Sequence, residues 1–409
     1  MMAGLRELTA HRYLLGFGFL MVFLSGHGQT FLISLYGGVL RESFDLSHAG
    51  FGGLYSLATL MSGVLVIGFG RGIDRFALPL VAGAVVLGAA SGGLLLALAT
   101  ASWMLVPALL LLRLCGQGLM VNLAQTTVAR GIKYKRGTAI SLITMGFPLA
   151  EAVMPAAVVA LMATLGWRGS WLLLVGLLLL IALPVVLLLL RAERQERAKR
   201  LDSPDSVPDE AMNGQPLAVD WRRSEVLRDR RFYQILPALL APPIVITALF
   251  FHQVPIAEGK GWSLALISSA FTAYAITHIV GLLLTGPLID RLGARRLLGV
   301  YLLPMLAALG VLGYAQSAAG AFVYLGLMGL CVGASGTLMG ALWPELYGLR
   351  HLGGIRAMAH GAMVLGTAAG PVLTGLLFDL GLSVSGLALV MAMYLVIAIL
   401  LVLPVARPI

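Results

Sequence analysis

The sequence predicts an all-α membrane protein with twelve transmembrane helices in two pseudo-symmetric bundles of six. Three observations support this fold class: an apolar composition, apolar segments of similar length and an internal repeat. Of the 409 residues, 59% are hydrophobic and only 11% are charged. A water-soluble fold needs more charged surface than this, so we expect lipid to surround most of the chain.

Twelve apolar segments are long enough to cross a membrane, because about 20 helical residues span its hydrocarbon core. They cover residues 13–38, 48–69, 78–100, 103–130, 138–165, 169–190, 232–256, 263–285, 297–316, 320–347, 357–379 and 384–405. The first segment is too long for the core of a signal peptide, and no small-residue cleavage pattern follows it. We therefore expect it to be retained as a helix.

Basic residues predict the orientation of these spans. The breaks on the side of both termini hold 24 Lys and Arg residues, and the opposite side holds three: Arg41, Arg168 and Lys260. By the positive-inside rule, both termini are expected in the cytoplasm, with the chain crossing the inner (plasma) membrane many times. This placement also accounts for the net charge of +10, so we do not expect nucleic-acid binding.

One long polar segment, residues 191–231, interrupts the apolar pattern. It predicts a cytoplasmic central loop between an N-terminal six-helix bundle at residues 1–190 and a C-terminal bundle at residues 232–409. The middle of the loop is rich in Pro, Asp, Ser and charge, which indicates a flexible linker. We expect helix near its end, at residues 221–230.

The two halves match without a gap at an offset of 216 residues. The matched pairs are Ser47 and Ser263, Gly70 and Gly286, Asp74 and Asp290, Arg75 and Arg291, Leu114–Cys115 and Leu330–Cys331, Gly137 and Gly353, and Pro155 and Pro371. Such duplication is common in transporters. Ser47 and Ser263 stand where the second helix of each half begins, so we expect both to be N-caps. The two cysteines are expected to be packing residues and not metal ligands.

Twelve spans in two repeats, with G-x-x-x-D-R at both 2–3 loops, resemble the major facilitator superfamily over the whole chain. The resemblance implies a gate that stabilises the state closed to the cytoplasm, at Gly70, Asp74, Arg75, Gly286, Asp290 and Arg291. The first copy departs from the family pattern after Arg75, where "FALP" replaces a Gly and basic residues. The alternative is that each Asp-Arg pair is a solvated turn without a gating role.

Fragments such as "GQTFLISLYGGVLRESFDLS" and "WPELYGLRHLGGIRAM" are similar to bacterial members of the monocarboxylate and oxalate-formate porter branch. This resemblance implies secondary transport of a small organic anion, such as a monocarboxylate, by alternating access at a midplane site, with coupled protons. The branch usually carries a basic residue in its eighth helix, often with an Asp, whereas this chain offers His278 there.

Three polar residues near the middle of spans break the repeat and are therefore candidates for function. Arg113, Glu151 and His27 have Gly, Thr and Pro at the equivalent positions of the second half. A charged side chain at the centre of a membrane helix costs about 2.5 to 3.5 kcal/mol on insertion scales. We therefore expect these residues to face a cavity or a partner.

Arg113 is the main candidate for substrate binding, because its guanidinium can bind two oxygens of an anion. Gln117, one turn further along the helix, shares its face. Further substrate-binding candidates are His27, Gln29, His252 and His278. The alternatives are that Arg113 is a structural strut bonded to backbone carbonyls and that His27 is a packing residue. Two glycines beside His27, in "SGHGQT", are expected either to let the first helix bend or to let a ligand approach the backbone.

Glu151 is the candidate for carrying the coupled proton. It lies on one stripe of the fifth span, together with Ser141, Thr144, Pro148 and Pro155. The alternative is a permanent structural pair of Glu151 with Arg113, since buried charges are usually paired. Glu345, His360 and Asp379 lie near helix ends, where we expect bonds to loops.

No phosphate-binding loop, nucleophile elbow or metal cluster occurs in the sequence, so we expect neither an enzyme nor a bound cofactor. We expect a monomer whose partners are a small solute, protons and lipid. Two alternative functions remain open. A drug:proton antiporter is the first, although "MGFPLAEAVMP" in the fifth span lacks the Gly-Pro and paired glycines usual there. A transporter-like membrane sensor, signalling through the central loop, is the second.

Overall fold

The computed structural model describes residues 9–70, 76–132, 136–201, 221–348 and 352–406. Within these ranges the regular structure is helical, without a strand. The predicted all-α fold is therefore confirmed. Helical structure throughout is what a lipid environment requires, because a helix satisfies its backbone hydrogen bonds internally.

The chain divides into two compact units. Unit 1 comprises residues 1–29, 61–150 and 161–216, and unit 2 comprises residues 30–60, 151–160 and 217–409. Helices α5 (His48–Gly70) and α10 (Gly146–Leu177) contribute residues to both units. These units follow packing, so the expected bundles at residues 1–190 and 232–409 stay a prediction.

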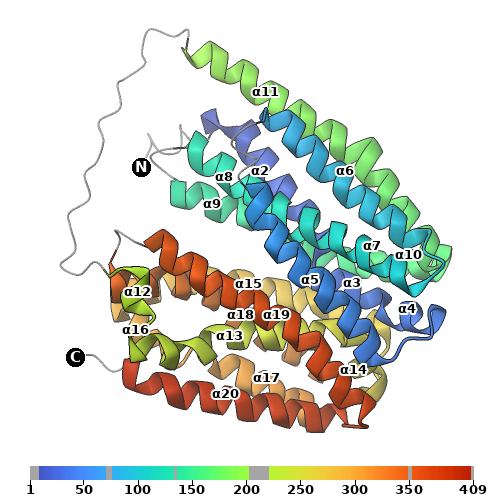
Figure 1. The fold of residues 1–409 in the computed structure, drawn as a ribbon, viewed down its shortest axis with the longest axis vertical. Helices are drawn as coiled ribbons and strands as arrows, with labels where there is room; N and C mark the ends of the chain where they lie inside the picture. The colour runs from blue at the N-terminus through green and yellow to red at the C-terminus, as the bar shows by residue number, and fades with distance from the viewer. Residues whose placement is uncertain (1–8, 71–75, 133–135, 202–220, 349–351, 407–409) are drawn as a thin grey trace. The chain divides into compact units, whose positions relative to one another are not determined.

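Unit 1 is built from helices around a core of buried aliphatic and aromatic side chains. Besides its parts of α5 and α10, it contains α2 (Arg12–Leu24), η1 (Ser25–Gly28), α6 (Leu78–Ala97), η4 (Ser102–Met104), α7 (Leu105–Leu111), η5 (Leu112–Met120), α8 (Val121–Gly131), α9 (Arg136–Thr144), η6 (Leu178–Ala182) and α11 (Leu183–Leu201). Figure 1 shows α11 beside α6, and α11 also packs on α2.

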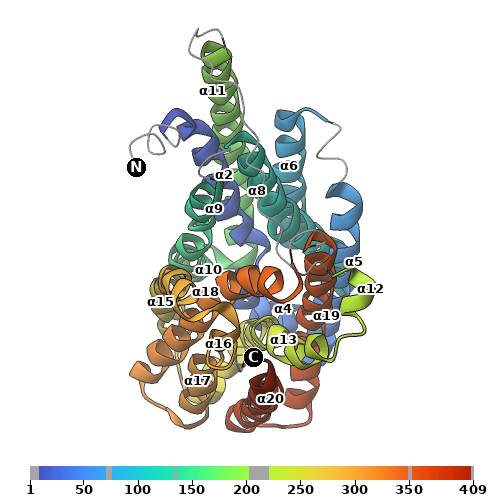
Figure 2. The same cartoon turned by 90° about the vertical axis from the view of Figure 1, so that its left-hand side faces the viewer.

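Unit 2 contains the remaining helices. They are α3 (Thr30–Ile33), η2 (Ser34–Tyr36), α4 (Gly37–Ser43), α12 (Arg223–Val226), α13 (Arg230–Phe251), α14 (Gln253–Lys260), α15 (Leu264–Leu292), α16 (Ala294–Leu298), α17 (Leu303–Tyr314), α18 (Ala318–Tyr347), α19 (Leu352–Asp379) and α20 (Val384–Ala406). Figure 2 shows α15, α17 and α18 gathered on one side of the unit. The helix expected within residues 221–230 is α12, and α13 begins at Arg230.

The predicted membrane spans each have a counterpart. In the described residues, ten helices are long and apolar enough to cross a membrane, or eleven if the bent pair Arg12–Gly28 and Thr30–Ser43 counts as one span. One of the ten runs over 61 residues, Thr138–Ala198, about three times the length that a membrane requires. Gly166 interrupts it with φ +68° and ψ 170°. Divided at this glycine, the stretch supplies the two predicted spans 138–165 and 169–190.

Local sequence signals account for several helix ends. Ser263 accepts the backbone N–H of Leu266 at 3.1 Å, and Ser47 accepts that of Gly50 at 2.9 Å. Both serines therefore cap their helices as the repeat predicts. The two matched cysteines are buried and free, in agreement with a packing role.

Helices α15 and α18 approach each other closely through glycine. A Cβ added to Gly329 would lie 2.1 Å from the carbonyl oxygen of Tyr274 and 2.5 Å from Thr277 Oγ1. Thr277 Oγ1 also donates a hydrogen bond of 2.6 Å across to the carbonyl of Gly326. Small residues bring membrane helices into backbone contact in this way, so the position of α15 depends on these glycines of α18.

Gly329→Ala should therefore lower the thermal unfolding midpoint of the purified protein, because the new methyl group meets rigid backbone. Overpacking of this kind costs about 1 to 3 kcal/mol. Gly336→Ala on the same helix is the matched control, since no atom lies within 4 Å of its added Cβ. Equal midpoints for the two variants would contradict the close contact of α15 with α18.

Candidate functional site

Arg113 lies where two irregular helical segments of unit 1 meet. It belongs to η5, a π-helix, and its side chain is buried. Single π-helical turns occur often at functional sites because they reposition side chains. The other segment is η1, a short 3₁₀ helix with His27 and Gly28, whose C-cap is Gln29. The regular helix of the first span is therefore interrupted at the glycines around His27.

Glycine allows these two segments to touch. A Cβ on Gly28 would lie 2.0 Å from the carbonyl oxygen of Leu112, and a Cβ on Gly116 would lie 2.8 Å from the backbone of Gly28. Any larger residue at either position would push the first span away from η5. Arg113 is thus positioned by backbone contact and not by side-chain packing alone.

Within this site Arg113 Nη1 donates to the carbonyl oxygen of Gly28 at 3.5 Å. His27, also buried, has its Nδ1 2.9 Å from the carbonyl oxygen of Leu24 in its own helix. Gln29 follows in extended conformation, with φ −82° and ψ 152°. Gln117 lies one turn after Arg113 and is partly buried. The structure therefore brings the break in the first span, with His27 and Gln29 on either side of Gly28, against the segment that carries Arg113 and Gln117.

Glu151 has a partner that the sequence analysis did not assign to it. Its Oε2 lies 3.0 Å from Nδ1 of His278 on α15, and both residues belong to unit 2. The side chains of Glu151 and His278 are only 10% and 14% exposed. The expected alternative partner, Arg113, belongs to unit 1, and that pairing stays a prediction.

The packing of α15 orients His278. The ring of Tyr274, one turn earlier, meets the imidazole edge-on with centroids 5.7 Å apart and an interplanar angle of 76°. Tyr274 is itself fully buried against Phe250 and Phe271. An ionised carboxylate only accepts hydrogen bonds, so Nδ1 of His278 must carry the hydrogen. The arrangement can hold one or two protons between a carboxylate and an imidazole.

A signal for this pair was present in the repeat. At the offset of 216, His278 corresponds to Ser62, so His278 breaks the symmetry as Glu151 does. Two symmetry-breaking polar residues in different spans are candidates for a contact. A sequence contains no distance between residues 127 positions apart, so the contact itself is seen only in the structure.

His252 lies in a different environment from His278. It is buried at the break between α13 and α14, with Nδ1 3.1 Å from the carbonyl oxygen of Ala248. Its ring centroid is 5.5 Å from that of Phe378 and 6.1 Å from that of His48. The structure thus places this predicted substrate residue in an aromatic cluster with His48.

The expected gating residues are only partly within the described chain. Asp74 and Arg75 lie outside the described residues, and so does the side chain of Asp290. Gly70 is the last residue of α5. Gly286 and Arg291 lie in α15, which ends shortly before Gly293.

A carboxylate from α18 binds the N-terminus of α16, the short helix that follows α15. Glu345 Oε2 accepts the backbone N–H of Ala294 at 2.8 Å, directly after Gly293, whose φ is +81°. This positive φ favours glycine. Glu345 was expected to bond to a loop, but its partner is the first residue of α16. The bond ties α18 to the helix that follows the second G-x-x-x-D-R copy.

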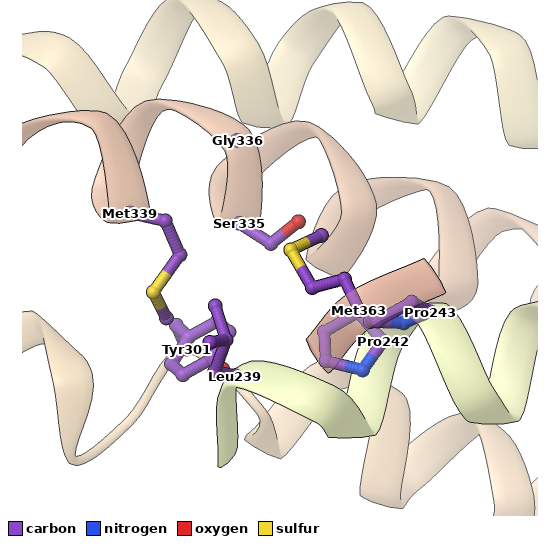
Figure 3. A pocket seen from close by; sticks show the side chains of 8 residues that line it. All are labelled: Leu239, Pro242, Pro243, Tyr301, Ser335, Gly336, Met339 and Met363. Carbon is purple, nitrogen blue, oxygen red and sulfur yellow. The ribbon is translucent and has the colours of Figure 1, made fainter. Parts of the chain in front are cut away.

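Unit 2 also contains a small apolar cavity of about 60 Å³. Figure 3 shows its lining side chains, which come from α13, α18, α19 and the loop before α17: Leu239, Pro242, Pro243, Tyr301, Ser335, Gly336, Met339 and Met363. Pro242 lacks the N–H that would bond to the carbonyl of Ala238, and the Tyr301 hydroxyl donates to that carbonyl instead. None of the predicted site residues lines this cavity.

The described residues contain no group of three or more His, Cys, Asp or Glu side chains placed to hold a metal ion. The candidate chemistry in the two units is therefore that of a guanidinium in unit 1 and a carboxylate-imidazole pair in unit 2. A guanidinium binds anions, and a carboxylate-imidazole pair binds and releases protons.

Comparison with known proteins identifies relatives at the level of the fold. A sequence model of the Major Facilitator Superfamily matches residues 18–263 and 246–408. Two solved structures of a bacterial homolog to the human lysosomal transporter Spinster are similar, each with 16% identity and 97% of both chains covered. The TM-score is 0.68 for the inward-facing, unoccupied form and 0.70 for the inward-facing, occupied form. Among curated proteins, none matches the sequence.

Proposed function

Because the chain belongs to the major facilitator superfamily, we propose that it is a secondary transporter that moves a small organic anion by alternating access, coupled to protons. The observation that carries this proposal is the buried pair of Glu151 and His278, 3.0 Å apart. We propose that it lies in the inner membrane as a monomer. The distribution of its basic residues supports an orientation with both termini in the cytoplasm.

The Glu151–His278 pair has the properties of a proton carrier. A carboxylate alone in a membrane interior is costly, so an ionised Glu151 needs a hydrogen-bond donor, and His278 supplies one. A further proton on the carboxylate removes its charge and with it the ion-pair attraction between α10 and α15. The two side chains share one hydrogen bond, so a change of proton on either of them acts on the contact between the two helices.

Arg113 supplies the anion-binding chemistry. Its guanidinium offers five N–H donors in a planar fork, which matches the two oxygens of a carboxylate. The broken first span beside it provides backbone groups near the same position, as discontinuous helices do at transporter sites. Gln117, His27 and Gln29 are proposed as further contacts of the substrate, and a monocarboxylate is the proposed substrate class.

Glu151→Gln tests proton coupling. The variant should lose pH-driven accumulation of radiolabelled lactate or pyruvate in proteoliposomes, because its amide cannot accept the coupled proton. It should keep exchange of the same solute without a gradient. Glu42→Gln, the same substitution at an exposed position, is the control. Gradient-driven uptake by Glu151→Gln at the wild-type level would exclude Glu151 as the proton carrier.

Arg113→Lys tests the anion site. Lysine keeps the positive charge and loses the two-pronged geometry, so half-saturation for the transported monocarboxylate should rise by about tenfold, which corresponds to about 1.4 kcal/mol. The control is Arg194→Lys on the exposed face of α11. An unchanged half-saturation in folded Arg113→Lys, or uptake of cationic dyes without uptake of any monocarboxylate, would contradict the proposal.

A further inference from the structure

One end of unit 2 is held closed by a contact between the start of α5 and the end of α19. Asp379, the last residue of α19, accepts the backbone N–H groups of His48 and Ala49 at 3.0 and 2.8 Å. A carboxylate at a helix N-terminus satisfies amides that lack helical partners and faces the positive end of the helix dipole. This interaction joins residues 330 positions apart.

The helices in this contact meet backbone to backbone. A Cβ on Gly375 would lie 2.7 Å from the carbonyl group of His48, and a Cβ on Gly52 would lie 2.8 Å from the carbonyl oxygen of Pro371. Further along, Ser56 Oγ donates to the carbonyl oxygen of Ala368 at 2.5 Å. The bonds of Asp379 are exposed and that of Ser56 is buried, so the contact becomes more buried along α5. A polar group in its buried part must find a protein partner or remain unsatisfied.

Two histidines lie at this contact, and their hydrogen positions follow from their neighbours. Arg41 Nη1 is 3.1 Å from Nε2 of His48, and since a guanidinium only donates, Nε2 is an acceptor and the hydrogen of the neutral ring is on Nδ1. In His252, Nδ1 lies 3.1 Å from the carbonyl oxygen of Ala248 and must donate, which leaves Nε2 as the acceptor.

The remaining nitrogen of each ring lacks a hydrogen bond. His48 Nδ1 and His252 Nε2 are buried and have no hydrogen-bond partner among the described residues. The two rings lie side by side, with centroids 6.1 Å apart, and both pack on Phe378. An unsatisfied donor and an unsatisfied acceptor therefore occur in neighbouring imidazoles, and Nε2 of His252 is the nitrogen that can accept a proton.

A proton on His252 would weaken the contact. The imidazolium would be only 2% exposed, with an N–H that has no acceptor, and burial of such a charge is costly. Two charged groups act on this imidazolium: Arg41 on α4 repels it, and Asp379 on α19 attracts it. Glu258 on α14 in turn attracts Arg41. If Asp379 turned toward the imidazolium, it would leave the amides of α5. Separation of α5 from α19 would let water reach the imidazolium and would lower the free-energy cost of its charge.

We propose that His48 and His252 form a proton-binding site that opens the contact between α5 and α19. On the orientation proposed above, this contact faces away from the cytoplasm, so acid outside the cell would favour the state open to the outside. The site is separate from Glu151 and His278. It adds a response of the contact between α5 and α19 to external pH, beyond the coupled proton of the proposed function, and depends on that function for the orientation alone.

Accessibility of a cysteine at Ser56 reports on the contact. Ser56→Cys changes one atom in the closed interface, and the two native cysteines are buried. In full-length protein in proteoliposomes, its labelling by an impermeant maleimide should accelerate as external pH falls. One proton bound by one state alone changes the open population by up to about tenfold per pH unit. The side chain of Tyr314 is 90% exposed, so the labelling rate of Tyr314→Cys at each pH corrects for the pH dependence of thiol chemistry.

Glu151→Gln serves as the background that separates the two proton sites. In this background the corrected acceleration should persist, and addition of His252→Gln should abolish it. His11→Gln is the matched control, because His11 pairs with Glu193 in unit 1 and should not affect the response. His252→Phe, which keeps the ring against Phe378, is the second variant if His252→Gln does not fold.

Two results would overturn the proposal. The first is a pH response that disappears in Glu151→Gln alone, which would assign all of it to the proposed proton carrier and leave that function intact. The second is a response of equal size in Glu151→Gln with and without His252. Loss of coupled transport in Glu151→Gln together with loss of the labelling response only on removal of His252 would support two separate proton sites.

Discussion

The cost of placing a polar or charged group in a hydrocarbon interior governs where this chain keeps its polar side chains. Helices satisfy the backbone, so the remaining cost falls on a few side chains. Glu151 offsets this cost by a hydrogen bond with His278, and Arg113 offsets part of it by a hydrogen bond to the carbonyl of Gly28. Each of these side chains is therefore bound to another helix, and a change in its charge acts on helix packing.

Glycine makes these polar contacts possible. Gly28 and Gly116 bring the broken first span against η5 and Arg113, and Gly329 brings α18 against the part of α15 that carries Tyr274 and His278. In both places a methyl group would meet backbone atoms. The chain thus positions its two proposed binding groups by close helix contact, and substitutions of these glycines should alter function without touching a charged residue.

Much of the fold could be predicted from the sequence, because membrane spans are defined by local hydropathy and the caps at Ser47 and Ser263 by local spacing. The break in the first helix at His27 could also be predicted locally, from the two glycines beside it. The π-helix around Arg113 was not predicted, since it forms where the chain packs on Gly28. The pairing of Glu151 with His278 and the bonds of Asp379 to α5 join distant residues, and hydropathy carries no information on such contacts.

Coupled transport as proposed here depends on Glu151, which must take up and release a proton inside the protein. Infrared difference spectroscopy of the purified protein over a pH series measures this directly, because a protonated carboxylic acid has a carbonyl band that a carboxylate lacks. If Glu151 carries the proton, the carbonyl band of a protonated carboxylic acid should grow as pH falls, disappear in Glu151→Gln and shift in His278→Gln. A spectrum in which this band is absent at every pH, or remains in Glu151→Gln, would contradict this role of Glu151.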